Sequence, residues 1–193
     1  MRMKVVGIDL AGSEKRPTGF CILDGFKAKT MVLYTDREII AKVKRVEPVL
    51  VAIDAPLTLP EGRKSLKEKS NIHFRKCDRE LAKLGIKFFP ITLGPMRMLT
   101  ERGIRLKKVL KKYKVIEVYP GAAQDIWEIP RKQKGLEDLK NGLKKLGVKG
   151  INDVQTGDEL DAVTAALVGK LYLENKYVAL GDRREGQIII PKF

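Results

Sequence analysis

The chain has few of the residues that form disulfides, zinc sites or aromatic platforms. Its 193 residues include two cysteines, one histidine and one tryptophan, and aromatic residues make up 6%. Cys21 and Cys77 are far apart and lack the spacing of a metal site, so we expect buried free thiols. A zinc site is not expected without a second histidine or paired cysteines.

The chain also lacks a long apolar run and an N-terminal targeting segment. No stretch approaches the ~20 consecutive apolar residues of a membrane-spanning helix. Met1–Val5 runs directly into a strand-like segment without the shape of a signal peptide, so we expect a cytoplasmic protein with no membrane partner. The length suits one domain with its own core, and we predict a single domain over residues 1–193.

Positive charge is in excess. Lys and Arg number 39 against 24 Asp and Glu, which gives a formal net charge of +15. Abundant Lys and Glu with only four Asn and four Gln are typical of a thermophile surface, but that enrichment alone would be nearly neutral. The excess therefore favours nucleic acid, either DNA or RNA, as a partner.

Apolar runs predict a sheet that begins with three antiparallel strands. Lys4–Asp9 is typical of a buried strand and ends in an acid. Thr18–Leu23 and Phe26–Tyr34 are β-rich runs joined through Asp24-Gly25, and Asp-Gly at such a place is a strong hairpin signal.

A helix then leads to a fourth strand. Thr35 and Glu38 form a capping box that opens a helix to about Val46. Val49–Ile53 is again a buried strand and is followed by an acid, Asp54. A strand reached through a helix is most simply parallel to an earlier strand of the same sheet.

Helices and strands alternate in the rest of the chain. Residues 55–113 are rich in Lys, Arg and Pro, and we interpret them as a basic helical insertion between the fourth and fifth strands. Helices are predicted at Phe74–Leu84, Pro95–Lys112, Leu136–Leu146 and Gly157–Leu173, and strands at Val115–Tyr119 and Gln187–Ile190. The main order, βββ-α-β-α-β-α, predicts an α/β protein with a five-stranded mixed sheet, which is the RNase H-like order.

Acidic residues recur at the ends of the predicted strands. Asp9, Asp54 and Glu117 each lie in or just after an apolar strand, where an unpaired carboxylate is costly. Asp158 and Asp161 share one face of the last helix, and alanines beside them allow that helix to approach the sheet closely. Each acid alone could cap a helix or pair with Arg. Together they predict a catalytic site for Mg²⁺ or Mn²⁺, since clustered carboxylates repel unless a cation lies between them.

Basic residues near these acids are candidates for contacts with phosphates. Lys15 and Arg16 fall in the loop of the first hairpin, beside the predicted site. Arg75 and Arg79 are four residues apart on one predicted helix face and could hold phosphate. A surface network of these arginines with Asp78 is an equal alternative.

Seven motifs span nearly the whole chain. In order they are Gly7–Ser13, Arg16–Gly19, Ala52–Leu57, Arg75–Leu81, Glu117–Pro120, Asp158–Ala162 and Leu180–Asp182. With them the chain resembles an uncharacterised family of predicted nucleases with an RNase H-like fold. It is also similar to the Holliday-junction resolvases, which have acids on the first and fourth strands and a paired Asp-x-x-Asp on the last helix. That likeness implies metal ligands at Asp9, Asp54, Asp158 and Asp161, although the resolvases have Glu in place of Asp54.

The predicted function is metal-dependent hydrolysis of phosphodiester bonds in nucleic acid. Asp9, Asp54 and Asp161 are the predicted metal ligands, and Asp158 and Glu117 are further catalytic acids. One alternative is a non-catalytic nucleic-acid-binding protein in which the acids are structural. Another is a nucleotide-binding protein similar to actin-like ATPases and sugar kinases, which need a second such domain, so that this chain would have to form a homodimer.

Overall fold

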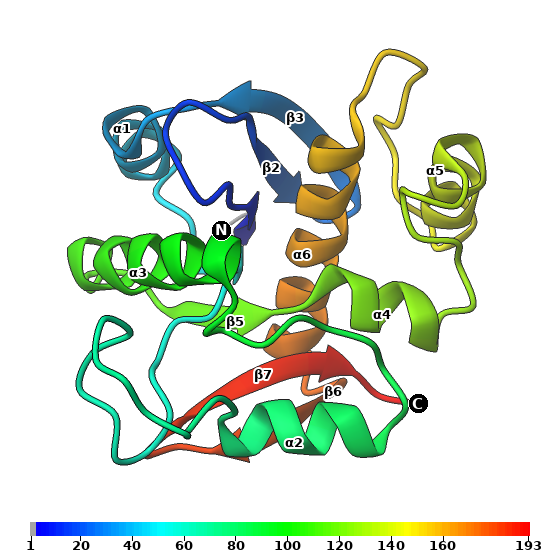
Figure 1. The fold of residues 1–193 in the computed structure, drawn as a ribbon. Coiled ribbons are helices and arrows are strands. Elements are labelled where there is room, and N and C mark those ends of the chain that lie inside the picture. Colours follow the sequence, from blue (N-terminus) through cyan, green and yellow to red (C-terminus); the bar gives the residue numbers. More distant parts are fainter. Residues whose placement is uncertain (1–2) are drawn as a thin grey trace.

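The sheet has seven strands, and the first strand lies near its centre. A computed structural model describes residues 3–193 (Figure 1), and the strands follow the order β3-β2-β1-β4-β5-β7-β6 across the sheet. The strands are β1 (Lys4–Asp9), β2 (Thr18–Asp24), β3 (Lys27–Leu33), β4 (Leu50–Asp54), β5 (Val115–Val118), β6 (Tyr177–Asp182) and β7 (Gly186–Pro191).

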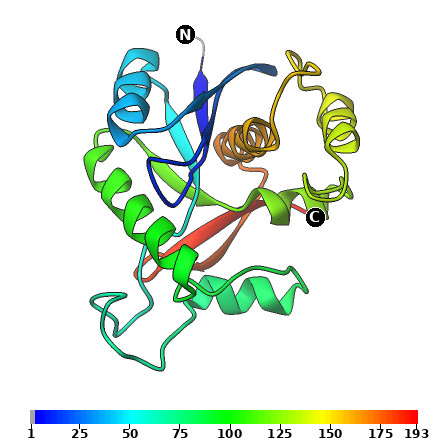
Figure 2. The same ribbon diagram turned by 45° about the horizontal axis from the view of Figure 1, so that its top comes forward.

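Helices cover both faces of this sheet. In Figure 2 the sheet lies between α1 and α3 on one side and α5 and α6 on the other, and each side has its own apolar cluster. A third cluster packs α2 against β6 and β7. The helices are α1 (Asp36–Val46), α2 (Lys76–Lys83), α3 (Gly94–Val109), α4 (Pro120–Ile126), α5 (Leu136–Lys145) and α6 (Gly157–Leu173).

Among residues 3–193, no helix combines the length and the apolar character needed to cross a membrane. The two cysteines, Cys21 and Cys77, are buried free thiols, as predicted.

The predicted antiparallel meander and the predicted parallel fourth strand are confirmed. β1, β2 and β3 form an antiparallel meander, and β4 is parallel to both β1 and β5. The β2–β3 turn lies one residue later than predicted, because Asp24 pairs with Lys27 and leaves Gly25 and Phe26 in the loop. Gly25 has φ 61°, a left-handed conformation that glycine adopts at little cost.

The prediction of five strands is wrong, because the C-terminal segment forms a hairpin that widens the sheet. β6 and β7 pair antiparallel, and β7 pairs parallel with β5. The apolar run of β6 is only four residues long (177–180), and most side chains of this edge strand are only partly buried, so it was not predicted as a strand. The short helix α4, which starts directly after β5, was not predicted either.

Close contact between α6 and the sheet depends on two glycines. A Cβ atom on Gly7 would lie 2.1 Å from the carbonyl oxygen of Ala162, and one on Gly19 would lie 1.9 Å from that of Asp158. Both distances are far shorter than a van der Waals contact, so only glycine, which has no Cβ atom, fits at these two positions. The helix that carries Asp158 and Asp161 therefore rests directly on the strands.

We predict that Gly7→Ala lowers the free energy of unfolding by about 1–3 kcal/mol or more, because the added methyl group overpacks the α6 contact. Gly94→Ala is the matched control, since its Cβ would meet nothing within 4 Å; its expected effect is within about 0.5 kcal/mol. Denaturant unfolding of both variants measures the difference. Equal stabilities of Gly7→Ala and Gly94→Ala would mean that α6 can move away from the sheet without a cost in free energy.

Candidate functional site

Two aspartates end neighbouring parallel strands on the face covered by α6. Asp9 is the last residue of β1 and Asp54 the last of β4, and the strand register pairs them directly. Gly7 and Ala52, two positions earlier, contact α6. Because side chains alternate along a strand, Asp9 and Asp54 point to the same face.

Three carboxylates surround a single ammonium group at this edge of the sheet. The Nζ atom of Lys132 lies 3.0 Å from Asp9 Oδ2, 2.7 Å from Asp158 Oδ1 and 2.9 Å from Asp161 Oδ2. Asp158 and Asp161 come from the first turns of α6, so the structure brings them to Asp9 as predicted from the helix spacing. Asp54 interacts electrostatically with Asp9 and Asp161 at the same place.

Sequence reasoning missed Lys132 and Gln124, which complete this cluster. Lys132 lies between α4 and α5 in a basic run whose composition is that of an ordinary exposed loop. Gln124 on α4 is buried and donates a hydrogen bond of 2.7 Å to Asp161 Oδ1. No spacing rule connects either residue to the acids, because their approach depends on how the chain after β5 folds back.

The cluster shifts the pKa values of its members. Burial raises the pKa of the Asp9 carboxyl to about 7, even though the adjacent Lys132 ammonium lowers it, and Asp161 adds to the rise. Burial also raises the pKa of Asp54 well above its ordinary value, with further contributions from Asp9 and Asp161. The pKa of Lys132 is raised in turn, because the attraction of the carboxylates outweighs its loss of solvation. Such pKa shifts are expected where buried carboxylates lie close together around one positive charge.

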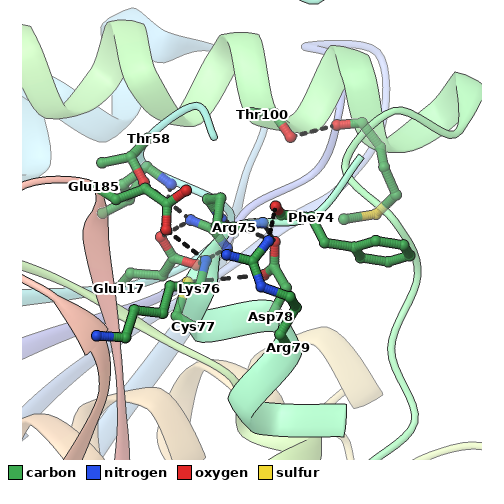
Figure 3. A network of polar contacts seen from close by, with 12 residues as sticks. Thr58, Phe74, Arg75, Lys76, Cys77, Asp78, Arg79, Thr100, Glu117 and Glu185 are labelled. Atoms are coloured by element: carbon green, nitrogen blue, oxygen red, sulfur yellow. Dashed lines mark hydrogen bonds and ion pairs between the residues drawn. The ribbon is translucent and has the colours of Figure 1, made fainter. Parts of the chain in front are cut away.

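Glu117 is engaged elsewhere, in an ion-pair network on the other side of β5. Its neighbours Ile116 and Val118 belong to the apolar cluster that includes α6, so alternation directs Glu117 away from Asp9. Figure 3 shows its carboxylate against Arg75, whose Nη2 and Nη1 atoms lie 2.7 Å from Oε1 and 2.8 Å from Oε2.

The predicted acids line two separate hollows. Asp54 and Glu117 line a pocket of about 170 Å³. Asp9 and Asp158 line a cleft of about 490 Å³ together with Lys132.

The basic candidates differ in accessibility. Arg75 is 1% exposed and also holds Asp78 at 2.8 Å, so the expectation that it contacts phosphate does not fit its place in this structure. Arg79, Lys15 and Arg16 are exposed, and Arg16 lines the cleft that contains Asp9.

The donor set suits a hard cation, although its present geometry is not that of a metal site. Among residues 3–193, no group of three or more His, Cys, Asp or Glu side chains is arranged to hold a metal ion. The carboxylates of Asp9, Asp158 and Asp161 nevertheless meet around one positive charge, and oxygen donors of this kind are those that Mg²⁺ and Mn²⁺ prefer. The Lys132 ammonium therefore stands where such an ion would have to enter.

Comparisons with known proteins give a family and a distant structural likeness. A family model described as "Protein of unknown function (DUF429)" matches residues 7–185. Among curated proteins, no sequence matches significantly. One similar solved structure is that of RuvC from Thermus thermophilus, at 14% sequence identity and a TM-score of 0.49, covering 90% of this chain and 96% of that chain.

We predict that Arg75→Met lowers the free energy of unfolding by about 3–5 kcal/mol, because Glu117 and Asp78 are left buried without a counter-charge. Arg79→Met, on the exposed face of the same helix, should change it by less than about 0.5 kcal/mol. Adding Glu117→Gln to Arg75→Met should restore part of the lost free energy of unfolding, because one unpaired carboxylate is removed. Denaturant unfolding measures these changes. Equal stability of Arg75→Met and Arg79→Met would contradict the role of Arg75 as the counter-charge of Glu117 and Asp78.

The pKa of Asp9 predicts a pH dependence of stability. Because this pKa is about 7 in the folded protein and 3.8 ordinarily, the native state binds the proton more tightly than the unfolded state. Relative to Asp9→Asn, the wild type should therefore lose stability as the pH rises from about 4 to about 7, by up to ~4 kcal/mol.

Unfolding titrations at several pH values measure this difference. Asp153→Asn, at an exposed position outside the cluster, should follow the wild type at every pH. Parallel curves for Asp9→Asn and the wild type would show that the pKa of Asp9 is not raised.

Proposed function

The chain belongs to the DUF429 family of proteins of unknown function, and we propose from its own residues that it hydrolyses phosphodiester bonds in nucleic acid with a divalent metal ion. The observation that carries the proposal is the convergence of Asp9, Asp158 and Asp161 on one cation at the end of the central strands, with Asp54 beside them. Carboxylates with raised pKa values gather at functional sites more often than elsewhere.

The proposed ligands are Asp9, Asp54 and Asp161, with Asp158 as a further acid that lines the cleft. Glu117 is outside this set, because Arg75 and the Leu57 N–H group bind its carboxylate oxygens. Mg²⁺ or Mn²⁺, when bound, would neutralise charge on the scissile phosphate and lower the pKa of a water molecule.

The chain's own residues would position the substrate. The Lys132 side chain must leave the centre of the cluster for a metal ion to enter, since both need the same carboxylate oxygens. Lys132 remains on the wall of the cleft and could then bind a phosphate oxygen. Arg16 on the same wall, with Lys15 and Arg79 on the exposed surface, would hold the nucleic-acid backbone. The net charge of +15 favours such a polyanion.

One observation favours a second candidate, a nucleic-acid-binding protein without catalysis. Lys132 already supplies a positive charge to three acids of the cluster, so the fold itself has a counter-ion without a metal ion. In that case the cluster would be structural, and Lys132 would stay in place. Metal binding separates the two candidates.

We predict that the wild type cleaves end-labelled DNA or RNA in Mg²⁺ or Mn²⁺ and that Asp9→Asn reduces cleavage to background, because one ligand carboxylate is lost. Asp153→Asn, purified identically, should retain full activity. Single-stranded, duplex and branched substrates with a chelator control complete the assay. Equal activity in wild type and Asp9→Asn would mean contamination or a different site.

Metal binding is tested without activity by thermal unfolding. Lys132→Met should bind Mn²⁺ more tightly than the wild type, since no ammonium competes for the carboxylates. Its unfolding temperature should therefore rise at lower Mn²⁺ concentrations, and Asp9→Asn should weaken this response. No response to Mn²⁺ in either wild type or Lys132→Met, together with no cleavage, would favour the non-catalytic protein.

A further inference from the structure

A third hollow, a pocket, opens where β5 and β7 diverge. The two strands pair only through Glu117 with Ile188 and Val118 with Ile189, so the start of each strand has no ladder partner in the other. A pocket of about 450 Å³ lies here, and Ile116 and Gln187 are among its lining residues. It shares no lining residue with the cleft that contains Asp9.

Three cations from three parts of the chain line this pocket. Lys107 comes from α3, Lys114 directly precedes β5, and Arg183 lies in the turn between β6 and β7. None of the three forms an ion pair with a carboxylate among residues 3–193. Three unpaired cations that converge on one hollow repel one another, and an anion relieves that repulsion.

The one carboxylate on the pocket wall does not supply this anion. Glu117 lines the pocket, but both its oxygens are held by Arg75 and one also accepts from the Leu57 N–H group (Figure 3 shows the Arg75 contact). Arg75, which also pairs with Asp78, is not among the residues that line the pocket. Three cations thus outnumber the single carboxylate of the pocket lining, and the pocket carries an excess of positive charge.

Neutral polar groups add hydrogen-bonding capacity to the same wall. Tyr172 and Tyr177 pack with ring centroids 4.5 Å apart, and the Lys114 ammonium lies 4.7 Å from the centroid of Tyr172. Both tyrosines and Gln187 line the pocket. Hydroxyl and amide donors beside Lys and Arg are the groups that proteins use to bind phosphate oxygens.

We propose that this pocket is a second anion site that binds phosphate groups, either of a nucleic-acid backbone or of a free nucleotide. Lys107, Lys114 and Arg183 supply the charge, and the tyrosines and Gln187 supply hydrogen bonds. The site is independent of the acidic cluster and requires no metal ion.

The experiment compares two triple variants with the same loss of charge. The pocket variant carries Lys107→Gln, Lys114→Gln and Arg183→Gln. The control carries Lys108→Gln, Lys112→Gln and Arg184→Gln at exposed neighbouring positions that do not line the pocket. Binding of tripolyphosphate, ATP, a fluorescent single-stranded oligonucleotide and a poly-glutamate peptide is measured in chelator at low salt.

The pocket variant should bind phosphate probes about tenfold to a hundredfold more weakly than the control, as expected for the loss of about three charge-assisted phosphate contacts. Binding of ATP and tripolyphosphate would identify free nucleotides as the source, and binding of the oligonucleotide alone would identify a nucleic-acid strand. Thermal unfolding checks that both variants fold.

Three results would overturn the proposal. They are no binding of any phosphate probe by the wild type, equal weakening in the two triple variants, and preferential binding of poly-glutamate. Equal weakening in the two triple variants and preferential binding of poly-glutamate concern this pocket alone, because Asp9 is untouched; the cleavage assay with Asp9→Asn tests the proposed hydrolysis separately.

Discussion

Burial of negative charge in the sheet is the constraint on which the rest of the structure depends. Asp9 and Asp161 are partly or wholly removed from water, and a carboxylate in that position needs a positive partner. Lys132 supplies it on the α6 face, and Arg75 supplies it to Glu117 on the other side of β5. The segments that carry these two cations, before α5 and at the start of α2, are thereby tied to the central strands.

The close contact of α6 with the sheet gives the acidic cluster its geometry. Gly7 and Gly19 remove the side chains that would hold the helix away, and Asp158 and Asp161 are thus placed against the end of β1. A helix displaced by one methyl group would separate these acids from Asp9. The same packing that stabilises the fold therefore holds the proposed metal ligands together.

Charge is distributed unequally over the molecule. Lys132 pairs with three acids of the cluster, whereas Lys107, Lys114 and Arg183 have no ion-pair partner among the described residues. A chain with a net charge of +15 thus has one cluster of acids around a cation at one edge of the sheet and cations without ion-pair partners at another place. Unpaired cations of this kind attract polyanions, which agrees with the proposed phosphate ligands.

The sequence by itself determined the first five strands, the β1-β2-β3 meander, the α1 capping box and the shared helix face of Asp158 and Asp161, because periodicity, turn signals and capping are local properties. It could not show that Glu117 faces away from Asp9, since that depends on a register in which Glu117 pairs with Ile53 rather than with Asp54. Nor could it assign Lys132 to the cluster or reveal β6 at the sheet edge. Ion pairs between distant segments and edge pairing are decided only when the chain folds back on itself, which is a property of tertiary structure.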